Sequence, residues 1–371
     1  MSVPESSLVA QSASPAISNI QWTPDGTARI FSQLKSGYNH TVSAMWQAER
    51  QLHKVSTPHF TPRKVACSKQ CPKSMFIYPV FLSTDPDLEE RIPGLPDQYI
   101  RGLNKLLPFL STLVAKGLHS VILFGTLLGS HPKDNIGSMA DSPEGPIRPA
   151  IPLIRQSFPN LYIIADVSLC EYTDHGHSSV LFKDGTVNNE ATVTRVSDMA
   201  LSFARAGANC VAPSDMSDGR IRAIKLKLLE VRLEGKVAIM SYSAKYASCL
   251  YGPFREAVSS KLVTDEHKRY LLPPPARKLA QKVILRDMHE GADMIIVKPG
   301  YADIISDAKS IAHVPVVAMQ VSGEFAMLHA AARAGVFDLK TMAFETTEVI
   351  VRAGADAVIS YFTPSFLDWL I

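Results

Sequence analysis

Two lysines follow runs of apolar residues that are typical of buried strands. Lys245 ends the segment MSYSAK and Lys298 lies in MIIVKPG, 53 residues further on. Burial disfavours a charged ammonium, and two cations that share one pocket repel, so at least one amine is pushed towards its neutral form. A neutral amine attacks ketones to form a Schiff base. The alternative is that each lysine extends its charged end from a strand into water.

The segments around these lysines alternate in a regular way. The predicted strands are Phe76–Leu82, Ser120–Phe124, Tyr162–Val167, Cys210–Pro213, Val237–Tyr242, Met294–Val297, Val314–Met319 and Ala357–Tyr361. Amphipathic stretches, such as those at 99–117, 193–207 and 346–356, lie between them, and helices are expected to end at Gly117, Gly207, Gly291 and Gly354. Continuous apolar strands alternating with helices indicate a parallel sheet covered on both faces. Eight of them favour an α/β fold of the (β/α)8 TIM-barrel type over an open doubly wound sheet, and no G-x-G-x-x-G follows the first strand.

The chain divides into three parts by composition. Residues 1–36, rich in Ser, Ala and Pro, are expected to form an extended, flexible N-terminal arm. Residues 37–74 are expected to hold an arm helix at 43–52 and an exposed basic loop, and residues 75–371 the catalytic barrel. Cys67 and Cys71 lack a matching second pair, so a solvated insertion is favoured over a metal site.

Composition limits the classes of partner. The 371 residues carry a formal net charge of +3, which is too small for this size to indicate nucleic-acid binding. No apolar run is long enough to span a bilayer, and the first residues lack the pattern of a secretory signal. Five scattered cysteines indicate a reducing compartment. We therefore expect a cytoplasmic protein that binds neither nucleic acid nor membrane.

In a (β/α)8 barrel, reactive side chains lie at the carboxyl ends of the strands. The residues predicted there are Phe124, Asp166, Ser214, Asp215, Lys245, Lys298, Ser322 and Tyr361. Lysines with a carboxylate and hydroxyls suit carbonyl chemistry through imines. Asp215 and Asp218 are interpreted as caps of the helix that starts near Gly219. Arg255, after the Gly252–Pro253 turn, is either a carboxylate-binding residue or an ordinary surface arginine.

Longer motifs resemble one enzyme family. SYSAKYASCLYGPFREA, GADMIIVKPG, VAPSDMSDGR, VSGEFAMLHAAA and FTPSFLDWL are similar to the porphobilinogen synthases, also called 5-aminolevulinate dehydratases, from about Gly37 to the carboxyl terminus. DVSLCEYTDHGH and FKDGTVN resemble the fungal branch most. The resemblance implies a (β/α)8 barrel with an arm used in assembly, usually of a homo-octamer. It also implies a lyase of haem and porphyrin biosynthesis that condenses two 5-aminolevulinate molecules asymmetrically to porphobilinogen.

The resemblance also assigns roles. Lys298 matches the lysine that forms the Schiff base with the first substrate molecule, and Lys245 the second lysine, which engages the other molecule and lowers the pKa of its neighbour. Arg255 matches an arginine that binds one carboxylate. The remaining matches are Ser322 and Tyr361 for the other carboxylate, Asp166 and Ser214 for the floor of the site, and Phe124 and Tyr251 for its aromatic wall. In the lid segment, His267 replaces a family arginine and Leu271 a glutamine.

The family's zinc site is altered in this chain. Zinc-dependent members carry three cysteines where this sequence has Ser168, Cys170 and Ser178. Hydroxyls are poor ligands for zinc, so we expect Cys170 to hold it only weakly, with His175 and His177 as further candidates. Magnesium is a second candidate cofactor, with Glu290 as its ligand by resemblance.

Three hypotheses follow. The first is a porphobilinogen synthase that acts on 5-aminolevulinate through Lys298 and Lys245. The second is a catalytically impaired paralogue of that enzyme, because the metal site and the lid are changed. The third is an aldolase that forms an imine with another small ketone and lacks the second substrate.

Overall fold

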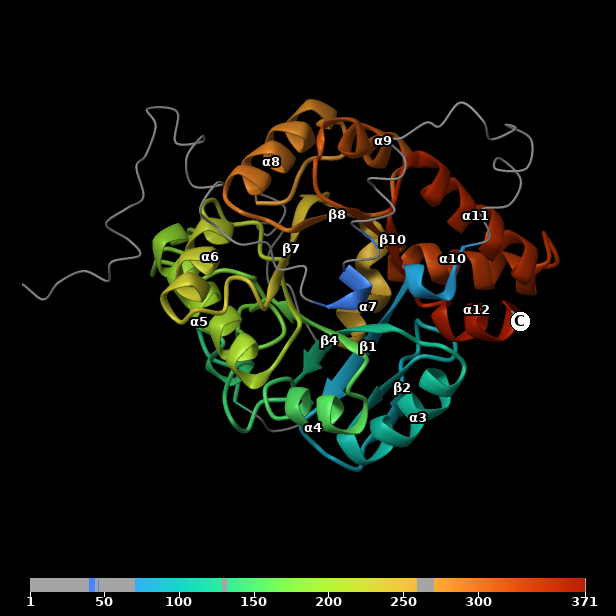
Figure 1. Ribbon diagram of the computed structural model, residues 1–371, viewed down its shortest axis with the longest axis horizontal. Coiled ribbons are helices and arrows are strands. Elements are labelled where there is room, and N and C mark those ends of the chain that lie inside the picture. The colour runs from blue at the N-terminus through green and yellow to red at the C-terminus, as the bar shows by residue number, and fades with distance from the viewer. Residues whose placement is uncertain (1–39, 44–45, 47–70, 129–131, 259–269, 371) are drawn as a thin grey trace, which may run out of the picture.

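The computed structural model describes residues 40–43, 46, 71–128, 132–258 and 270–370. Within these ranges, eight parallel strands close into a barrel in which each pairs with the next and the last pairs with the first (Figure 1). They are β1 Phe76–Ser83, β4 Ser120–Thr126, β5 Tyr162–Val167, β6 Cys210–Pro213, β7 Ala238–Lys245, β8 Met294–Lys298, β9 Val316–Met319 and β10 Ala357–Ile359. The predicted (β/α)8 barrel is confirmed, and each predicted apolar run overlaps one of its strands, although several strands, such as β7, extend beyond the predicted run. The arm predicted at 1–36 lies outside the described residues.

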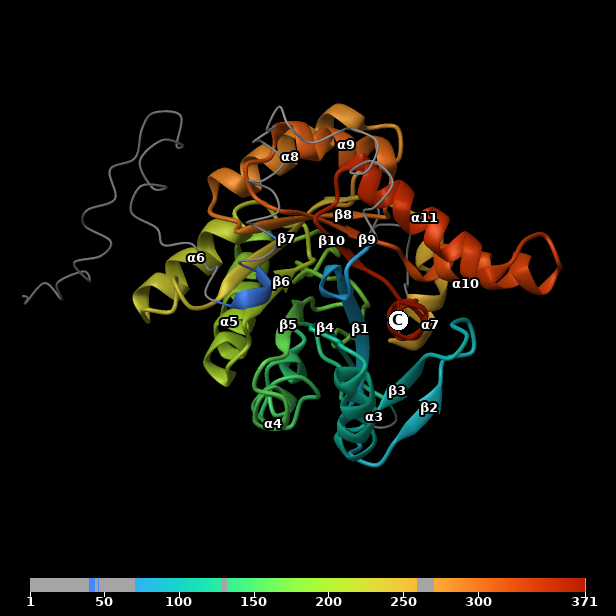
Figure 2. The same ribbon diagram turned by 45° about the vertical axis from the view of Figure 1, so that its right-hand side comes forward.

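Helices surround the barrel (Figures 1 and 2). They are α3 Leu103–Ala115, α4 Ala150–Ser157, α5 Asn189–Ala206, α6 Arg220–Glu230, α7 Gly252–Ala257, α8 Arg277–His289, α9 Ala302–Ile311, α10 Ser322–Arg333, α11 Leu339–Ala353 and α12 Thr363–Trp369. Short 3-10 turns occur at Lys73–Met75, Ser138–Ala140 and Cys249–Tyr251. The glycines predicted to end helices at 117, 207, 291 and 354 all have positive φ. Glycine adopts this conformation without steric cost, which is why it marks these junctions.

A short hairpin beside the barrel was not predicted. Strands β2 Glu89–Arg91 and β3 Tyr99–Arg101 pair in antiparallel fashion, and β3 extends the sheet from β1. The sequence assigned 99–101 to the helix that follows, and this assignment is wrong, because α3 begins only after Gly102. Strand β2 is exposed along its length, so it has no apolar run to reveal it.

The amino-terminal end of the barrel is closed by aromatic packing. Residues 41–43 and 46 are helical, and the buried Trp46 packs edge-on against Tyr162 at the start of β5, with ring centres 5.7 Å apart. The indole Nε1 donates a hydrogen bond to the carbonyl of Ser74 at 3.1 Å. The rest of the helix predicted at 43–52, and the loop at 53–70, lie outside the described residues.

The two aspartates before α6 are not caps. Gly219 is the N-cap of α6, and no side chain caps this helix. Asp215 is fully buried and pairs with Arg220 at 3.4 Å, while Asp218 pairs with Arg286. The capping interpretation is therefore wrong. These carboxylates form ion pairs with arginine side chains and do not accept hydrogen bonds from the first amides of the helix.

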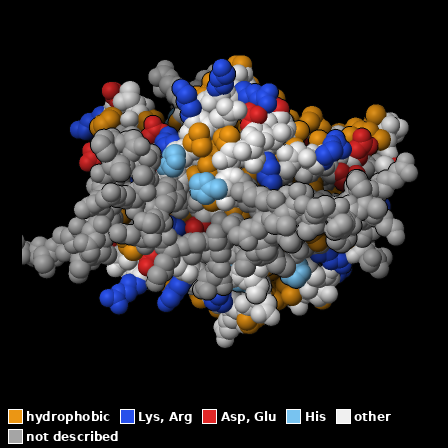
Figure 3. All heavy atoms as spheres, turned by 45° about the horizontal axis from the view of Figure 1, so that its top comes forward, with side chains coloured by type: hydrophobic (Ala, Val, Ile, Leu, Met, Phe, Trp, Pro, Cys, Tyr) orange, Lys and Arg blue, Asp and Glu red, His pale blue; other side chains and the backbone are white. Residues whose placement is uncertain are grey.

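On the face shown in Figure 3, basic side chains are interspersed with acidic and apolar ones. This mixture agrees with the small formal net charge of +3. None of the helices in the described ranges combines the length and the apolar character needed to cross a membrane.

Candidate active site

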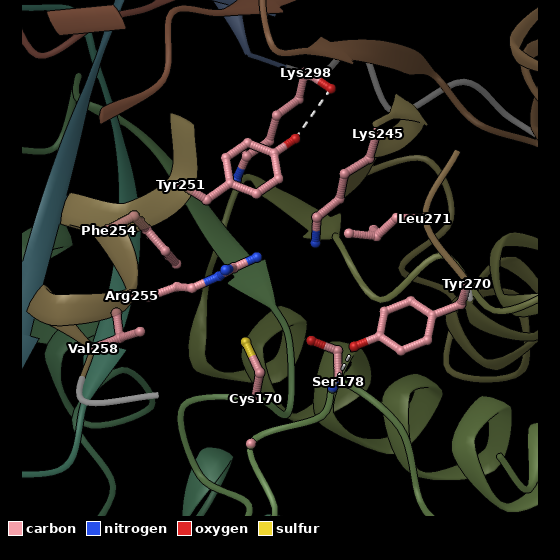
Figure 4. Close-up of a pocket in the computed structure, with 11 residues that line it drawn as sticks. Cys170, Ser178, Lys245, Tyr251, Phe254, Arg255, Val258, Tyr270, Leu271 and Lys298 are labelled. Atoms are coloured by element: carbon pink, nitrogen blue, oxygen red, sulfur yellow. Dashed lines mark hydrogen bonds between the residues drawn. The ribbon is translucent and has the colours of Figure 1, made fainter. Parts of the chain in front are cut away.

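The two lysines meet at the mouth of the barrel. Lys245 and Lys298 are the last residues of the neighbouring strands β7 and β8 and are direct partners across them. Tyr242 lies beside both amines, with its ring centre 5.9 Å from Nζ of Lys245 and 5.3 Å from Nζ of Lys298. Figure 4 shows both lysines projecting into the space that Arg255 also enters. The structure thus brings together the pair that the sequence singled out.

Lys298 is the better nucleophile by its surroundings. It is 5% exposed, and aromatic rings of Tyr251 and Phe254 lie 5.0 Å from its amine. Burial, and after it the neighbouring Lys245, lower the pKa of Lys298 to about 7 against the opposing effect of Asp166. About half of an amine with this pKa is neutral at pH 7, and the neutral form attacks ketones.

A buried carboxyl lies close enough to both lysines to interact with their charges. Asp166, near the end of β5, accepts a hydrogen bond from the hydroxyl of Ser214 at 3.2 Å, and the Ser214 carbonyl accepts one from Nζ of Lys245. Burial raises the pKa of Asp166 to about 8, and the nearby Glu171 contributes to this rise. One Asp166 oxygen has no hydrogen-bond partner among the described residues. Glu171, also buried, is a member of this charge cluster that the sequence analysis did not select.

The lysines face a pocket of about 500 Å³ that opens to solvent (Figure 4). Its lining comprises Cys170, Gly176, Ser178, Lys245, Tyr251, Phe254, Arg255, Val258, Tyr270, Leu271 and Lys298. Arg255 therefore lines the same pocket as the lysines, as the carboxylate-binding interpretation requires.

Some predicted residues lie behind this lining. The Ser322 hydroxyl accepts a hydrogen bond from the Phe254 amide and donates one to the Leu250 carbonyl, both at 3.1 Å, so it supports the segment that carries Arg255. Phe124 packs edge-on against Phe254, with ring centres 5.2 Å apart. His267 lies outside the described residues.

Tyr361 also lies behind the pocket wall. Its ring is stacked with Phe81 at 6.3 Å and packs against Phe325 at 5.6 Å. The Tyr361 hydroxyl is buried and has no hydrogen-bond partner among the described residues. Burial raises the pKa of this hydroxyl, so it stays protonated and can donate to a carboxylate.

Two aromatic residues of the site were missed by sequence reasoning. The Tyr270 hydroxyl accepts a hydrogen bond from the Ser178 amide at 3.3 Å, and Tyr270 follows directly after the segment that contains His267. Tyr242 was assigned only to a strand. Strict alternation would have turned it away from Lys245, because the two positions are an odd number of residues apart.

The residues at the family's zinc position do not suit zinc. The Ser168 hydroxyl lies 2.9 Å from that of Ser178 and 3.2 Å from the sulfur of Cys170, so the three groups bond to one another. Burial and the nearby Glu171 raise the pKa of the Cys170 thiol to about 12, which leaves it neutral. Zinc binds thiolates and imidazoles in preference to neutral hydroxyls.

Two of the other candidate ligands, His175 and Glu290, already have hydrogen-bond partners. The His175 ring nitrogen Nδ1 accepts a hydrogen bond from the His177 amide at 3.1 Å. Glu290 accepts one from the Arg222 amide at 3.3 Å and lies 3.7 Å from Arg286. In the part of the chain that the structure describes, there is no group of three His, Cys, Asp or Glu side chains that could hold a metal ion.

Comparisons with known proteins agree with this geometry. The family model described as delta-aminolevulinic acid dehydratase matches residues 49–369. Delta-aminolevulinic acid dehydratase of Candida glabrata is 50% identical over 92% of this chain and 96% of its own length. The enzyme of Schizosaccharomyces pombe is 46% identical over 92% and 98%, and that of Macaca fascicularis 43% identical over 91% and 98%.

A solved structure is similar as well. The delta-aminolevulinic acid dehydratase (porphobilinogen synthase) of Toxoplasma gondii, in complex with the reaction product porphobilinogen, has a TM-score of 0.79 and 35% identity to this chain. The match covers 83% of this chain and 88% of that one.

Proposed function

The chain belongs to the delta-aminolevulinic acid dehydratase family, and from this premise we propose that it condenses two molecules of 5-aminolevulinate asymmetrically to porphobilinogen. The reaction releases two molecules of water and makes the chain a lyase of haem and porphyrin biosynthesis. The observation that carries the proposal is the pairing of Lys298, whose pKa is about 7, with Lys245 in one pocket.

Lys298 starts the reaction in this proposal. Its neutral amine attacks the ketone carbon of the first 5-aminolevulinate, and a new N–C bond forms. The carbonyl oxygen then leaves as water, and an imine remains. Burial of the amine favours its neutral form, and the attraction of the Tyr251 and Phe254 ring faces for an ammonium offsets this only in part, since the pKa of Lys298 remains about 7.

The remaining residues hold the two substrate molecules. Lys245 engages the second molecule, and Arg255 binds a carboxylate with its guanidinium, which presents paired donors. The other assignments are Ser322 and Tyr361 for the second carboxylate, Asp166 and Ser214 for the floor, Phe124 and Tyr251 for the aromatic wall, and His267 for the lid. The role of Tyr361 in binding a carboxylate is supported by its buried hydroxyl, which has no hydrogen-bond partner in the described residues. Ser322 must exchange its two present hydrogen bonds to take this role.

Zinc has no part in this proposal. Ser168, Ser178 and Cys170 form a hydrogen-bonded cluster that offers zinc one sulfur and two hydroxyls, and hydroxyls are poor ligands for zinc. The family position of the metal is therefore a neutral hydrogen-bonded cluster in this chain. Magnesium at Glu290 is not proposed either, because this carboxylate already accepts a hydrogen bond from the Arg222 backbone amide and lies 3.7 Å from the Arg286 guanidinium.

A further part of the proposal concerns assembly. We propose a cytoplasmic homo-octamer in which residues 1–36 form the arm between subunits, residues 37–74 connect it, and residues 75–371 form the catalytic barrel. Family membership supports this part. Light scattering on the full chain and on a chain without residues 1–36 tests it. An unchanged mass on removal of the arm would contradict it.

The changed zinc position favours a second candidate, an impaired paralogue of the same family. It would fold, trap 5-aminolevulinate on Lys298 and release little porphobilinogen. An aldolase would also form the adduct but would act on another ketone, and no feature of the pocket favours it.

The test combines two measurements on the purified protein. Borohydride is added with 5-aminolevulinate, and peptide mass spectrometry locates the reduced adduct. Porphobilinogen is measured in parallel, without metal and with zinc or magnesium supplied. An adduct on Lys298 with porphobilinogen formed is the expected result, and Lys298→Met is the control without adduct. No porphobilinogen under any of these conditions would refute the proposed function.

A further inference from the structure

The strand that carries Lys245 contains an extra residue. Ser241 of β7 lies opposite Ile295 of β8, but Lys245 lies opposite Lys298. Four steps along β7 therefore match three steps along β8. Such a mismatch is a β-bulge, in which two residues of one strand oppose a single residue of the other. The bulge lies between Ser241 and Ala244.

This bulge decides which way Lys245 points. Side chains alternate along a regular strand, so Tyr242 and Lys245, an odd number of positions apart, would face opposite sides. In the structure both reach the interior. The Tyr242 hydroxyl contacts the sulfur of Met319 on β9, and its ring lies beside both lysine amines. Without the extra residue, Ala244 would be the partner of Lys298, and Lys245 would face the surrounding helices.

A buried arginine holds the bulge from outside the barrel. Arg220, the first residue of α6, donates from Nη2 to the Tyr242 carbonyl and to the Ser241 hydroxyl, both at 3.1 Å. Asp287 of α8 accepts from the same hydroxyl at 2.7 Å and from Arg220 at 3.2 Å. Because a bulge removes one residue from the regular ladder, its carbonyl needs such a donor from elsewhere.

Burying the charges of Arg220, Asp287 and Asp215 costs free energy, which argues that the cluster has a role other than stability. Arg220, Asp287 and Asp215 are all fully buried, and Asp215 lies 3.4 Å from the Arg220 Nε. Buried ion pairs are often no more stabilising than apolar residues of the same volume, because the charges lose their hydration. None of the three lines the pocket. What they provide is a set of directional hydrogen bonds at the bulge.

We propose that Arg220, held by Asp287 and Asp215, is a positioning residue that fixes the bulge at Tyr242 and so places Lys245 beside Lys298. This inference rests on the proposed function, because Lys245 matters to catalysis only if the site forms imines. Arg220 itself is not among the residues that line the pocket.

The test uses two variants and a matched control. Arg220→Lys keeps the charge but loses the planar fork that bonds to several acceptors at once. Ser241→Ala removes the hydroxyl that joins Arg220 to Asp287. The control is Lys225→Met, because Lys225 of the same helix forms a buried ion pair with Asp293 at 3.1 Å, and Asp293 bonds to the Ile239 amide of β7 below the bulge. Near-ultraviolet circular dichroism confirms that each variant is folded.

The first readout is the pH midpoint of borohydride trapping on Lys298. The groups that face this amine are Lys245 and Tyr242 from β7, Asp166 from β5, Cys170 and Glu171 from the loop after it, and Tyr251 and Phe254 from the segment that begins α7. Only Lys245 and Tyr242 depend on the bulge. In Arg220→Lys and Ser241→Ala we expect the midpoint to rise and porphobilinogen formation to fall, by roughly 10- to 100-fold for a displaced catalytic group. Lys225→Met should leave the midpoint unchanged.

A double variant separates positioning from general damage. If Arg220 acts through Lys245, Arg220→Lys should add no further rise in the midpoint to a chain that already carries Lys245→Met. A midpoint in Arg220→Lys equal to that of the wild type, or an equal rise in Lys225→Met, would refute the proposal.

A substrate-free measurement keeps the two proposals distinct. Formaldehyde and borohydride methylate neutral amines, and mass spectrometry reads the extent at Lys298 across the same pH series. If the wild type traps no 5-aminolevulinate, the proposed function fails. The positioning role of Arg220 is still tested by methylation. A higher pH midpoint for methylation of Lys298 in Arg220→Lys supports this role, and an unchanged midpoint refutes it.

Discussion

Replacing Lys245 by Met tests how the reactive amine is tuned. The two lysines are direct partners on neighbouring strands, so their charges interact at close range. Two charges about 5 Å apart, the spacing of neighbouring strands, repel by roughly 3 kcal/mol at an effective dielectric constant of about 20. This energy corresponds to about two pH units in the pKa of either group.

The expected direction of change follows from what lowers the pKa of Lys298 in the wild type. Burial and Lys245 both lower the pKa of Lys298, to about 7 from the ordinary 10.5. Removing the Lys245 charge therefore raises the midpoint towards about pH 9, while burial keeps it below the ordinary value. At pH 7 the neutral fraction of Lys298 falls from about one half to about one in a hundred, so trapping slows by roughly 50-fold. Near pH 10 the two proteins should differ little.

The assay is the initial rate of borohydride-trapped adduct on Lys298 between pH 6 and pH 10, with the site of the adduct read by mass spectrometry. Lys245→Arg is the matched control, because it keeps a positive charge at this position and should keep the midpoint near that of the wild type. If Lys245→Met has the same midpoint as the wild type to within half a pH unit, burial alone sets the pKa and the reasoning from paired cations fails.

Three further predictions concern the metal position, the substrate pocket and the amino-terminal end of the barrel. Ser168→Cys with Ser178→Cys should retain about one zinc ion per chain after dialysis, because three thiolates form a zinc site, whereas the wild type should retain none; zinc of equal content in the wild type would contradict this. Tyr361→Phe should leave the melting temperature unchanged, because the hydroxyl has no hydrogen-bond partner among the described residues, but should raise KM about tenfold; an unchanged KM would show that the hydroxyl does not bind substrate. Trp46→Ala should lower the free energy of unfolding by about 3–5 kcal/mol in denaturant titrations, because the buried ring fills the end of the barrel against Tyr162. The adduct on Lys298 per folded molecule should stay the same, and its loss would mean that Trp46 shapes the site as well.

The sequence by itself determined the barrel and the pair of lysines at the ends of its strands. Apolar runs followed by helices and by glycines such as Gly207 are local patterns, and local steric rules are enough to interpret them. The replacement of thiolates by Ser168 and Ser178 was also visible directly, because ligand type is a property of each residue. Hairpin strand β2 was missed because its residues are exposed and form no apolar run.

Tertiary structure alone decided how the site is oriented. Asp215 resembled a helix cap in the sequence, yet it is buried against Arg220, because only the packing of α6 on the barrel determines which charge meets which. The bulge in β7 is equally hidden, since it is a mismatch between two strands and a single strand cannot show it. Strand periodicity would place Tyr242 and Lys245 on opposite faces, and the extra residue reverses this. The sequence therefore supplied the two lysines, and the register between their strands decided that they face each other.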